Sequence, residues 1–440
     1  MMRVAVRGAV WFGLYVTIAV FPLVFAAIGV MEERRGFSRE FAVALGFVGL
    51  SMIGLQLLLV ARIKAVAAPF GEDALVAFHR YMGYAGTAFV LAHPVLLIVL
   101  VDPSYIVRVI PWTAPWAGRF GTLAILCLII VIVTSVWRVR LRISYEVWQA
   151  IHLVASTVAL IAALVHVELI NYYVDRPWKR GLWILMTAAV LAVFLWVRVI
   201  RPALRMRHPW IVTSVVEERG GISAITFRPV DHAGFTFAPG QFGWLSVHRS
   251  PFSLTQHPFS FSSNGDDPSA LQMGIKGLGD FTRTVAHIQP GTRAYIDGPH
   301  GVFSPDRNQG PGFVFIAGGV GISPIMSMLR TLAARGDRRP CHLFYGVKHI
   351  DDAAFREEID DLTARLDLTV CYVVAEPEPD WTGHRGYIGP ETLRSVLPVN
   401  RQSLQYFICG PGALQDAMEK GLGDLAVPAA HIHTEHFNFV

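Results

Sequence analysis

The chain has 440 residues, and its hydrophobic fraction of 53% averages an apolar first half and a mixed second half. This length predicts two or three domains. The net charge of +5 and the isoelectric point near 9.1 come from basic loops and do not indicate a nucleic-acid-binding protein. The chain has four cysteines without paired spacing, which argues against disulfides and zinc sites.

Six apolar runs in the first 200 residues are each long enough to cross about 30 Å of hydrocarbon. They cover residues 10–30, 41–61, 81–101, 120–137, 147–167 and 181–197. The first run is followed by the charged stretch 32–35 and has no small-residue cleavage pattern, so we interpret it as a retained helix and not as a signal peptide. The sequence therefore predicts six membrane-spanning helices.

Arginine and lysine cluster on one side of the membrane if the six spans alternate in direction. The clusters lie at residues 3–7, 62–64, 138–142 and 198–207. Because the cytoplasmic side of a membrane protein carries an excess of basic residues, we expect this side, and everything after residue 200, to be cytoplasmic.

Residues 1–200 contain four histidines, and all of them lie in or at the edge of spans three and five. His79 and His93 belong to the third span, His152 and His166 to the fifth, and 14 residues separate the members of each pair. Fourteen residues are close to four helical turns, so both members lie on nearly the same helix face, about 21 Å apart along the axis. Since the two spans run in the same direction, we expect His79 to face His152 and His93 to face His166.

Two facing imidazole pairs suit two bis-histidine haems, with the first pair on the cytoplasmic side. Interhelical hydrogen bonds and a proton relay are the alternatives, although a relay usually needs carboxylates at depth, and Glu168 and Asp175 lie at the external end. Zinc is disfavoured because each level supplies only two nitrogens. Arg80, next to His79, is a candidate partner for a haem propionate or an anchor at the lipid headgroups.

After residue 207 the sequence changes to short β-branched and aromatic runs broken by Gly and Pro, at residues 210–216, 222–228 and 243–247. This pattern predicts a small antiparallel barrel. The segment His257-Pro258-Phe259-Ser260 offers a planar face and a hydroxyl group to a flavin. The alternative is a strand with an ordinary turn.

A glycine-rich segment follows at residues 274–282 and includes Lys276, Gly279 and Thr282. It leads into an expected helix at residues 281–287, which begins with Phe281. Because helix starts with free backbone donors bind phosphates and Lys276 adds positive charge, the segment is a candidate phosphate site. A glycine-rich hairpin is the alternative.

From about residue 312 strands and helices alternate, which predicts an open parallel sheet with a nucleotide at the carboxyl ends of its strands. A strand at 313–317 precedes the turn Gly318-Gly319-Val320-Gly321-Ile322-Ser323-Pro324, and a helix follows at 325–334. The glycines allow a pyrophosphate to approach the backbone closely, and Pro324 suits a first helical turn.

Three later features lie near the expected nucleotide. Lys348 follows the strand 341–347 and is either a partner for a nucleotide 2′-phosphate or a solvated lysine. The strand 405–408 leads into Cys409-Gly410-Pro411, where the small thiol either faces the cofactor or fills the core. The terminal segment 435–440, which contains Phe437 and Phe439, either completes a sheet or covers the flavin ring.

Taken together, these motifs resemble the NADPH oxidase and ferric reductase superfamily over nearly the whole chain, although Ser260 stands where the family often has threonine. The resemblance implies a multi-domain fold in which a six-helix transmembrane haem-binding bundle is followed by a ferredoxin-reductase-like module. The bundle covers 1–205, an FAD-binding antiparallel β-barrel domain 206–308, and an NAD(P)-binding α/β domain 309–440. The implied cofactors are FAD, two b-type haems and NADPH or NADH, with Phe437 shielding the flavin and Phe439 a weaker candidate.

The resemblance also predicts a function. Electrons would pass from cytoplasmic NAD(P)H through FAD and the two haems, across a bacterial inner membrane, to an external acceptor. Dioxygen giving superoxide is the leading acceptor, because the external loops contain no cluster of histidine, methionine or cysteine that would hold a metal. A ferric chelate and a separate periplasmic protein are the alternatives, and no obligate protein partner is evident in the sequence.

Overall fold

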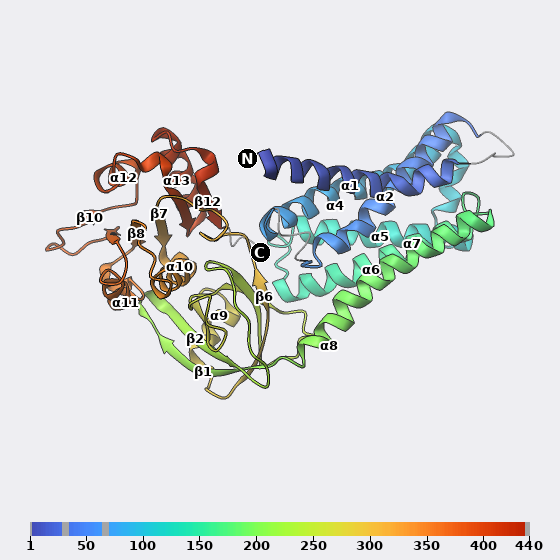
Figure 1. The fold of residues 1–440 in the computed structure, drawn as a ribbon. Helices are drawn as coiled ribbons and strands as arrows, with labels where there is room; N and C mark the ends of the chain where they lie inside the picture. Colours follow the sequence, from blue (N-terminus) through green and yellow to red (C-terminus); the bar gives the residue numbers. More distant parts are fainter. Residues whose placement is uncertain (1, 29–34, 64–69, 436–440) are drawn as a thin grey trace. The chain divides into compact units, whose positions relative to one another are not determined.

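The computed structural model describes residues 2–28, 35–63 and 70–435. The chain divides into two compact units between Arg201 and Pro202. The first unit consists of helices and the second contains two six-stranded sheets (Figure 1). This arrangement confirms the predicted fold class.

The described residues of the first unit form six helices that are long and apolar enough to cross a membrane, in agreement with the six predicted spans. They are α1 (Met2–Ala27), α2 (Phe37–Leu59), α4 (Glu72–Leu96), α5 (Trp116–Val136), α6 (Tyr145–Ile170) and α7 (Pro177–Leu195). The α4 span continues through a π-helical turn to Val101, and α7 continues through another into α8 (Arg201–Arg205). Many large apolar side chains on these helices are exposed, as expected for a surface that lipid covers.

Local sequence explains where one of the key helices begins and ends. The hydroxyl of Ser144 accepts a hydrogen bond from the backbone N–H of Val147 at 3.4 Å and caps the start of α6. Asn171 ends the helix in the left-handed conformation, with φ of 55°. Within the bundle, α2 packs along α4 and α5 packs along α6.

The second unit begins with a closed antiparallel sheet, as predicted. Its strand order is β4-β3-β6-β1-β2-β5, and an isolated bridge from Phe261 to Met273 links the two edges. Trp210, Phe227 and Phe261 are fully buried in its core. The strands are β1 (Trp210–Glu217), β2 (Ile222–Pro229), β3 (Phe242–Val247), β4 (His257–Ser260), β5 (Leu271–Lys276) and β6 (Arg293–His300).

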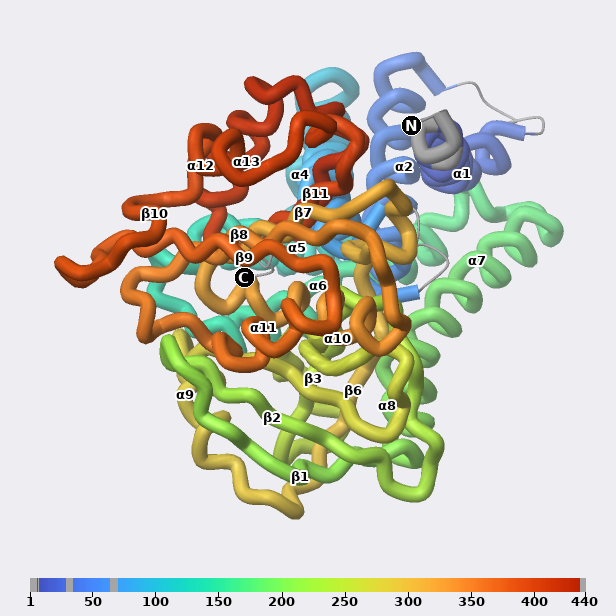
Figure 2. Tube along the Cα trace, turned by 60° about the vertical axis from the view of Figure 1, so that its left-hand side comes forward, coloured from blue at the N-terminus to red at the C-terminus, as the bar shows by residue number. Residues whose placement is uncertain are grey.

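A parallel sheet of order β10-β9-β8-β7-β11-β12 follows. Its strands are β7 (Phe313–Gly318), β8 (Cys341–Val347), β9 (Leu368–Val374), β10 (His384–Arg385), β11 (Gln405–Cys409) and β12 (Ile432–Glu435). Separate apolar clusters cover its two faces, one with α10 (Ile322–Ala334) and α11 (Arg356–Leu362), the other with α12 (Pro390–Val396) and α13 (Gly412–Asp424). Figure 2 shows these two helix pairs on opposite sides of the strands. All six residues of β7 are buried, as expected for a central parallel strand.

Two details differ from the sequence-based expectation. The helix expected from residue 325 already begins at Ile322, so Ser323 and Pro324 occupy its first turn, where a proline needs no hydrogen-bond acceptor. The expected terminal aromatic strand at 435–440 is described only up to Glu435, where β12 ends. Phe437 and Phe439 lie outside the described residues.

Candidate functional site

The four histidines of the bundle form two facing pairs. The ring centroids of His79 and His152 are 6.1 Å apart, and those of His93 and His166 are 6.5 Å apart. One member of each pair comes from α4 and the other from α6. The structure therefore brings together the residues that the 14-residue spacing places on the same levels.

The spacing of each pair matches an iron held between two imidazoles. With metal–nitrogen bonds of about 2.0 Å and a ring centroid about 1.1 Å behind each nitrogen, such an iron separates the centroids by about 6 Å. No group of three or more potential metal ligands occurs among the described residues, so each level offers a pair of histidines. Two axial nitrogens are what a haem needs, since its porphyrin supplies the other four.

Backbone carbonyls fix the tautomer of the second pair. Nδ1 of His93 lies 2.9 Å from the carbonyl oxygen of Ala42 on α2, and Nδ1 of His166 lies 2.7 Å from that of Ala117 on α5. Because a carbonyl oxygen only accepts hydrogen bonds, Nδ1 carries the proton in both rings. The Nε2 lone pair is then left for a metal, which is the arrangement usual for metal-ligating histidines.

A serine hydroxyl fixes the tautomer of His152 in the first pair. The Ser135 hydroxyl donates to the carbonyl of Val131 at 2.6 Å, so its lone pairs accept from Nε1 of Trp148 at 3.2 Å and from Nδ1 of His152 at 3.3 Å. Nδ1 of His152 is therefore the protonated nitrogen. Arg80, predicted to be either a propionate partner or a headgroup anchor, is exposed on α4 one residue after His79.

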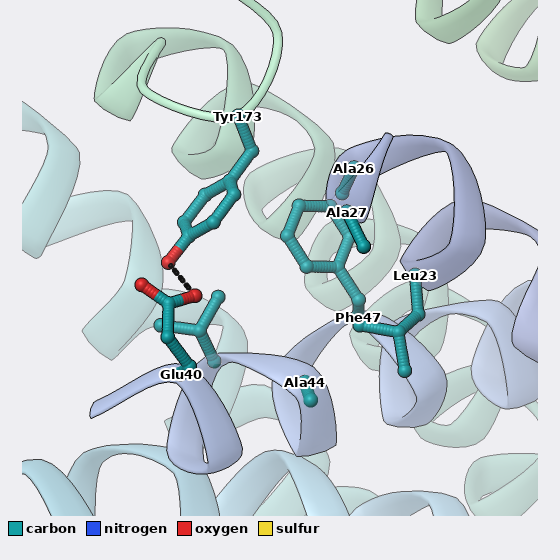
Figure 3. A pocket seen from close by; sticks show the side chains of 8 residues that line it. Leu23, Ala26, Ala27, Glu40, Ala44, Phe47 and Tyr173 are labelled. Atoms are coloured by element: carbon teal, nitrogen blue, oxygen red, sulfur yellow. Dashed lines mark hydrogen bonds between the residues drawn. The ribbon is translucent and has the colours of Figure 1, made fainter. Parts of the chain in front are cut away.

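A small, mostly apolar cavity lies elsewhere in the bundle (Figure 3). Its volume is about 50 Å³, and apolar residues of α1 and α2 line it together with Glu40 and Tyr173. Burial and the neighbouring Glu40 carboxylate raise the pKa of the Tyr173 phenol, so it stays protonated and donates to Glu40 at 3.0 Å. The cavity has room for water-sized molecules only.

The predicted flavin motif forms one side of an aromatic cluster. His257 on β4 stacks on Phe281, with centroids 4.2 Å apart and planes 8° apart, and Phe259 lies 6.2 Å from the same ring. Phe281 belongs to the short helix α9 (Asp280–Thr284), and Ser260 is buried at the end of β4. The cluster offers the flat surface that a flavin ring requires.

The two predicted phosphate-binding segments lie next to each other. The Ser323 hydroxyl donates to the carbonyl of Gly274 at 3.1 Å, and Nζ of Lys276 comes within 4.0 Å of the position that a side chain on Gly319 would take. In contrast, the backbone N–H of Gly279 is already bound by the Thr282 hydroxyl at 2.7 Å. Lys276 is therefore the positive group that this segment brings to the nucleotide turn.

The glycines of the nucleotide turn are required by its neighbours. A Cβ on Gly321 would lie 2.1 Å from the carbonyl oxygen of Cys409, and one on Gly318 would lie 3.0 Å from Cδ of Pro411. Gly319 has φ of 53°, which disfavours a side chain. The turn and the Cys409-Gly410-Pro411 segment thus form a single surface at the carboxyl ends of β7 and β11.

The helix that follows this turn fixes it to the barrel. Arg330 on α10 donates to the carbonyl of Ser262 and to Oε1 of Gln272, both at 2.7 Å, and forms a two-pronged ion pair with Glu358 at 2.6 and 2.5 Å. The hydroxyl of Thr331 accepts from the backbone N–H of a barrel loop at 2.9 Å. The nucleotide turn is therefore held in a defined place relative to the flavin motif.

Two predicted site residues have specific surroundings. Lys348, just after β8, is exposed and pairs with Glu376 just after β9, with Nζ and Oε2 3.4 Å apart. Cys409 is fully buried, and burial together with the nearby Glu435 raises the pKa of its thiol well above the usual range. The thiol therefore stays protonated.

The sequence reading missed the groups that hold the histidine rings, namely Ala42, Ala117 and Ser135. They come from α2 and α5, far from the histidines in sequence. Small residues inside apolar spans are a signal of close helix contact, and glycines do occur four residues after both alanines.

Comparison with known proteins finds two family matches, in separate parts of the chain. Residues 45–163 match the family described as ferric reductase like transmembrane component, and residues 315–420 match the oxidoreductase NAD-binding domain. The first match includes His79, His93 and His152, and the second includes the glycine-rich turn and Cys409.

Individual relatives resemble the second half of the chain. Ferredoxin–NADP reductase B of Sorangium cellulosum is 26% identical over 226 residues, which cover 49% of this chain and 92% of that protein. A flavohemoprotein of Deinococcus radiodurans is 28% identical over 243 residues, 52% of this chain and 59% of that protein, so the chain spans little more than half of its length. A solved ferredoxin reductase in carbazole 1,9a-dioxygenase aligns with 52% of this chain and 69% of its own, at 23% identity and a TM-score of 0.46.

The matched domains and the six candidate spans make the protein an NAD(P)H-dependent oxidoreductase of a membrane. The chain joins a ferric-reductase-like transmembrane domain to a ferredoxin-reductase-type module with an NAD-binding domain, and this combination is the architecture of the NADPH oxidase and ferric reductase superfamily.

Proposed function

We propose that this protein carries electrons from cytoplasmic NAD(P)H, through FAD and two b-type haems, to an acceptor on the other side of a bacterial inner membrane. The observation that carries the proposal is the pair of histidine levels between α4 and α6, with centroid spacings of 6.1 and 6.5 Å. In this assignment residues 1–205 form the haem domain, 206–308 the FAD domain and 309–440 the NAD(P) domain.

On the donor side, the chain's own residues bind and orient the two nucleotides. The glycine turn at 318–321 would let the pyrophosphate of NAD(P)H approach the backbone closely, and Lys276 adds a positive charge beside Gly319. The stacked rings of His257 and Phe281 support the flavin, with Phe437 as the sequence-based candidate for its other face. FAD supplies the conversion of a two-electron donor into single-electron steps, and the haems supply one-electron carriers.

On the membrane side, His79 and His152 would hold the inner haem, and His93 and His166 the outer one. The carbonyls of Ala42 and Ala117 hold Nδ1 of the outer rings, so both Nε2 atoms stay unprotonated. The two levels are about 21 Å apart along the helices. The apolar spans around them keep water and protons away from the path.

Dioxygen, reduced to superoxide, is the acceptor we favour. The external loops contain no cluster of histidine, methionine or cysteine that would hold a metal ion. A ferric chelate is the second candidate, favoured by the match of residues 45–163 to a ferric reductase like transmembrane component. Electron supply to a separate periplasmic protein is a third possibility.

Purified protein in lipid nanodiscs, supplied with NADPH or NADH, separates these acceptors. The proposal expects cytochrome c reduction in air that superoxide dismutase suppresses and that is absent under argon. Reduction of a ferric chelate under argon that is faster than superoxide formation in air would identify ferric iron, and not dioxygen, as the acceptor. Turnover that requires an added periplasmic protein would contradict both of these acceptors.

A pair of histidine variants links this activity to the membrane path. In His93→Ala we expect the external reduction to be lost while NAD(P)H still reduces the flavin under argon. His287→Ala, an exposed histidine of the barrel domain, is the matched control and should behave as wild type. Full external activity in His93→Ala would overturn the proposed path.

A further inference from the structure

Two glycines on different helices contact the two histidine rings of the second level. A Cβ added to Gly46 on α2 would lie 3.2 Å from Cγ and 3.3 Å from Nδ1 of His93. A Cβ added to Gly121 on α5 would lie 3.0 Å from Nδ1 and 3.2 Å from Cε1 of His166. In each case the ring lies directly over the place where any other residue carries a side chain.

Both glycines stand four residues after the alanine whose carbonyl binds the same ring. Gly46 follows Ala42, which accepts from His93 at 2.9 Å, and Gly121 follows Ala117, which accepts from His166 at 2.7 Å. In an α-helix the carbonyl of residue i points toward residue i+4, so a side chain at i+4 stands beside that carbonyl. A ring that reaches the carbonyl from outside the helix therefore has to cross the i+4 position.

We propose that Gly46 and Gly121 are positioning residues of the outer haem site. Their missing side chains let His93 and His166 rest against α2 and α5 and donate Nδ1–H to the two backbone carbonyls. This inference rests on the proposed haem ligation and adds to it residues that touch neither iron nor substrate.

The hydrogen bonds matter because they determine what the other ring nitrogen does. With Nδ1–H held by a carbonyl, Nε2 keeps its lone pair and the ring plane is fixed toward the opposite histidine. Contacts between 3.0 and 3.4 Å are already tight, so with an alanine the ring has to shift by a few tenths of an ångström, which disturbs the geometry of its hydrogen bond to the carbonyl. Losing such an outer-shell partner typically weakens metal binding by about 10–100-fold.

The inner level serves as an internal control, because neither His79 nor His152 is among the nearest atoms to a Cβ added at any of the described glycines. Nδ1 of His152 is bound by the Ser135 hydroxyl on α5 and not by a backbone carbonyl beside a glycine. Substitutions at Gly46 or Gly121 should therefore affect one haem and leave the other in place.

The test measures haem content and haem spectra in the purified full-length protein. Gly46→Ala and Gly121→Ala give small displacements, and Gly46→Leu and Gly121→Leu give large ones. Gly54→Ala on α2 is the matched control, because the nearest atom to its added Cβ is Cγ2 of Val190 at 3.9 Å. Gly181→Leu on α7 is a second control, since nothing lies within 4 Å of its added Cβ.

We expect wild type and both controls to hold two haems per chain by pyridine haemochromogen assay. The two leucine variants should hold one, with the optical and low-spin EPR spectrum of His93→Ala, and the alanine variants should show a shifted signal for one haem with the other unchanged. Two haems with wild-type EPR signals in both leucine variants would overturn the inference while leaving the proposed ligation intact. Fewer than two haems in wild type would instead overturn the proposed function.

Discussion

Replacing Arg330 with methionine tests how much the hydrogen bonds between α10 and the barrel contribute to the stability of the second unit. The side chain of Arg330 is 17% exposed, and its Nη1 donates to Ser262 O and to Gln272 Oε1, both at 2.7 Å. Methionine leaves these two acceptors without a charged donor, at about 1.5 kcal/mol each. The ion pair with the more exposed Glu358 adds at most about 1 kcal/mol, so we expect a total loss of about 3 kcal/mol.

The assay is heat-induced release of flavin fluorescence from the full-length protein in detergent. For a unit of about this size, 1 kcal/mol corresponds to about 2–4 °C, so Arg330→Met should lower the midpoint by about 6–12 °C. Glu358→Gln, which removes only the exposed partner, should lower it by less than about 4 °C.

Midpoints of Arg330→Met and Glu358→Gln within 2 °C of each other would refute this reasoning. They would show that the bonds from α10 to the barrel contribute no more than a surface ion pair. A large loss of flavin reduction by NAD(P)H in Arg330→Met, with normal haem spectra, would add that the same contacts align the two nucleotides.

Three further predictions concern the nucleotide-binding half. Gly321→Ala places a Cβ 2.1 Å from Cys409 O, so anaerobic stopped-flow should show flavin reduction slowed at least about 100-fold, with haem content unchanged. Glu376→Gln removes the carboxylate that lies 3.4 Å from Lys348 and would repel a nucleotide 2′-phosphate. The ratio of kcat/KM for NADPH to kcat/KM for NADH should therefore rise about tenfold. An unchanged ratio would exclude Glu376 from the choice between the two nucleotides. Burial and the neighbouring His431 lower the pKa of His433 to about 4, so this ring is neutral in the folded protein at neutral pH. Its contribution to the free energy of unfolding is complete above pH 6.5 and decreases as the pH falls toward 4. The variant His433→Phe should therefore flatten that part of the curve of stability against pH.

Much of the fold follows from patterns that are local in the sequence. Three patterns each depend only on the surroundings of a single segment, namely lipid, water or the protein core. They are the apolar runs of span length, the β-branched runs between Gly and Pro, and the alternation of strand, turn and helix after residue 312. The histidine levels were also predictable, because two equal spacings on helices of the same direction determine which rings face each other.

What the sequence did not reveal depends on contacts between segments. The partners of His93 and His166 come from α2 and α5, and no periodicity within one helix identifies the carbonyl of another. Similarly, Arg330 binds the barrel and Lys348 pairs with Glu376 only because the chain folds back on itself. The early start of α10 at Ile322 was not predicted either, although Pro324 is compatible with a first helical turn.

The central claim is that electrons cross the membrane through two histidine-held haems in a fixed order. Anaerobic optical titration of purified wild type and His152→Ala with NAD(P)H tests it most directly. We predict that wild type reduces its flavin and both haems, whereas His152→Ala loses one haem, reduces its flavin normally and leaves the remaining haem oxidised. Two haems in His152→Ala, or reduction of the remaining haem at the wild-type rate, would contradict the account.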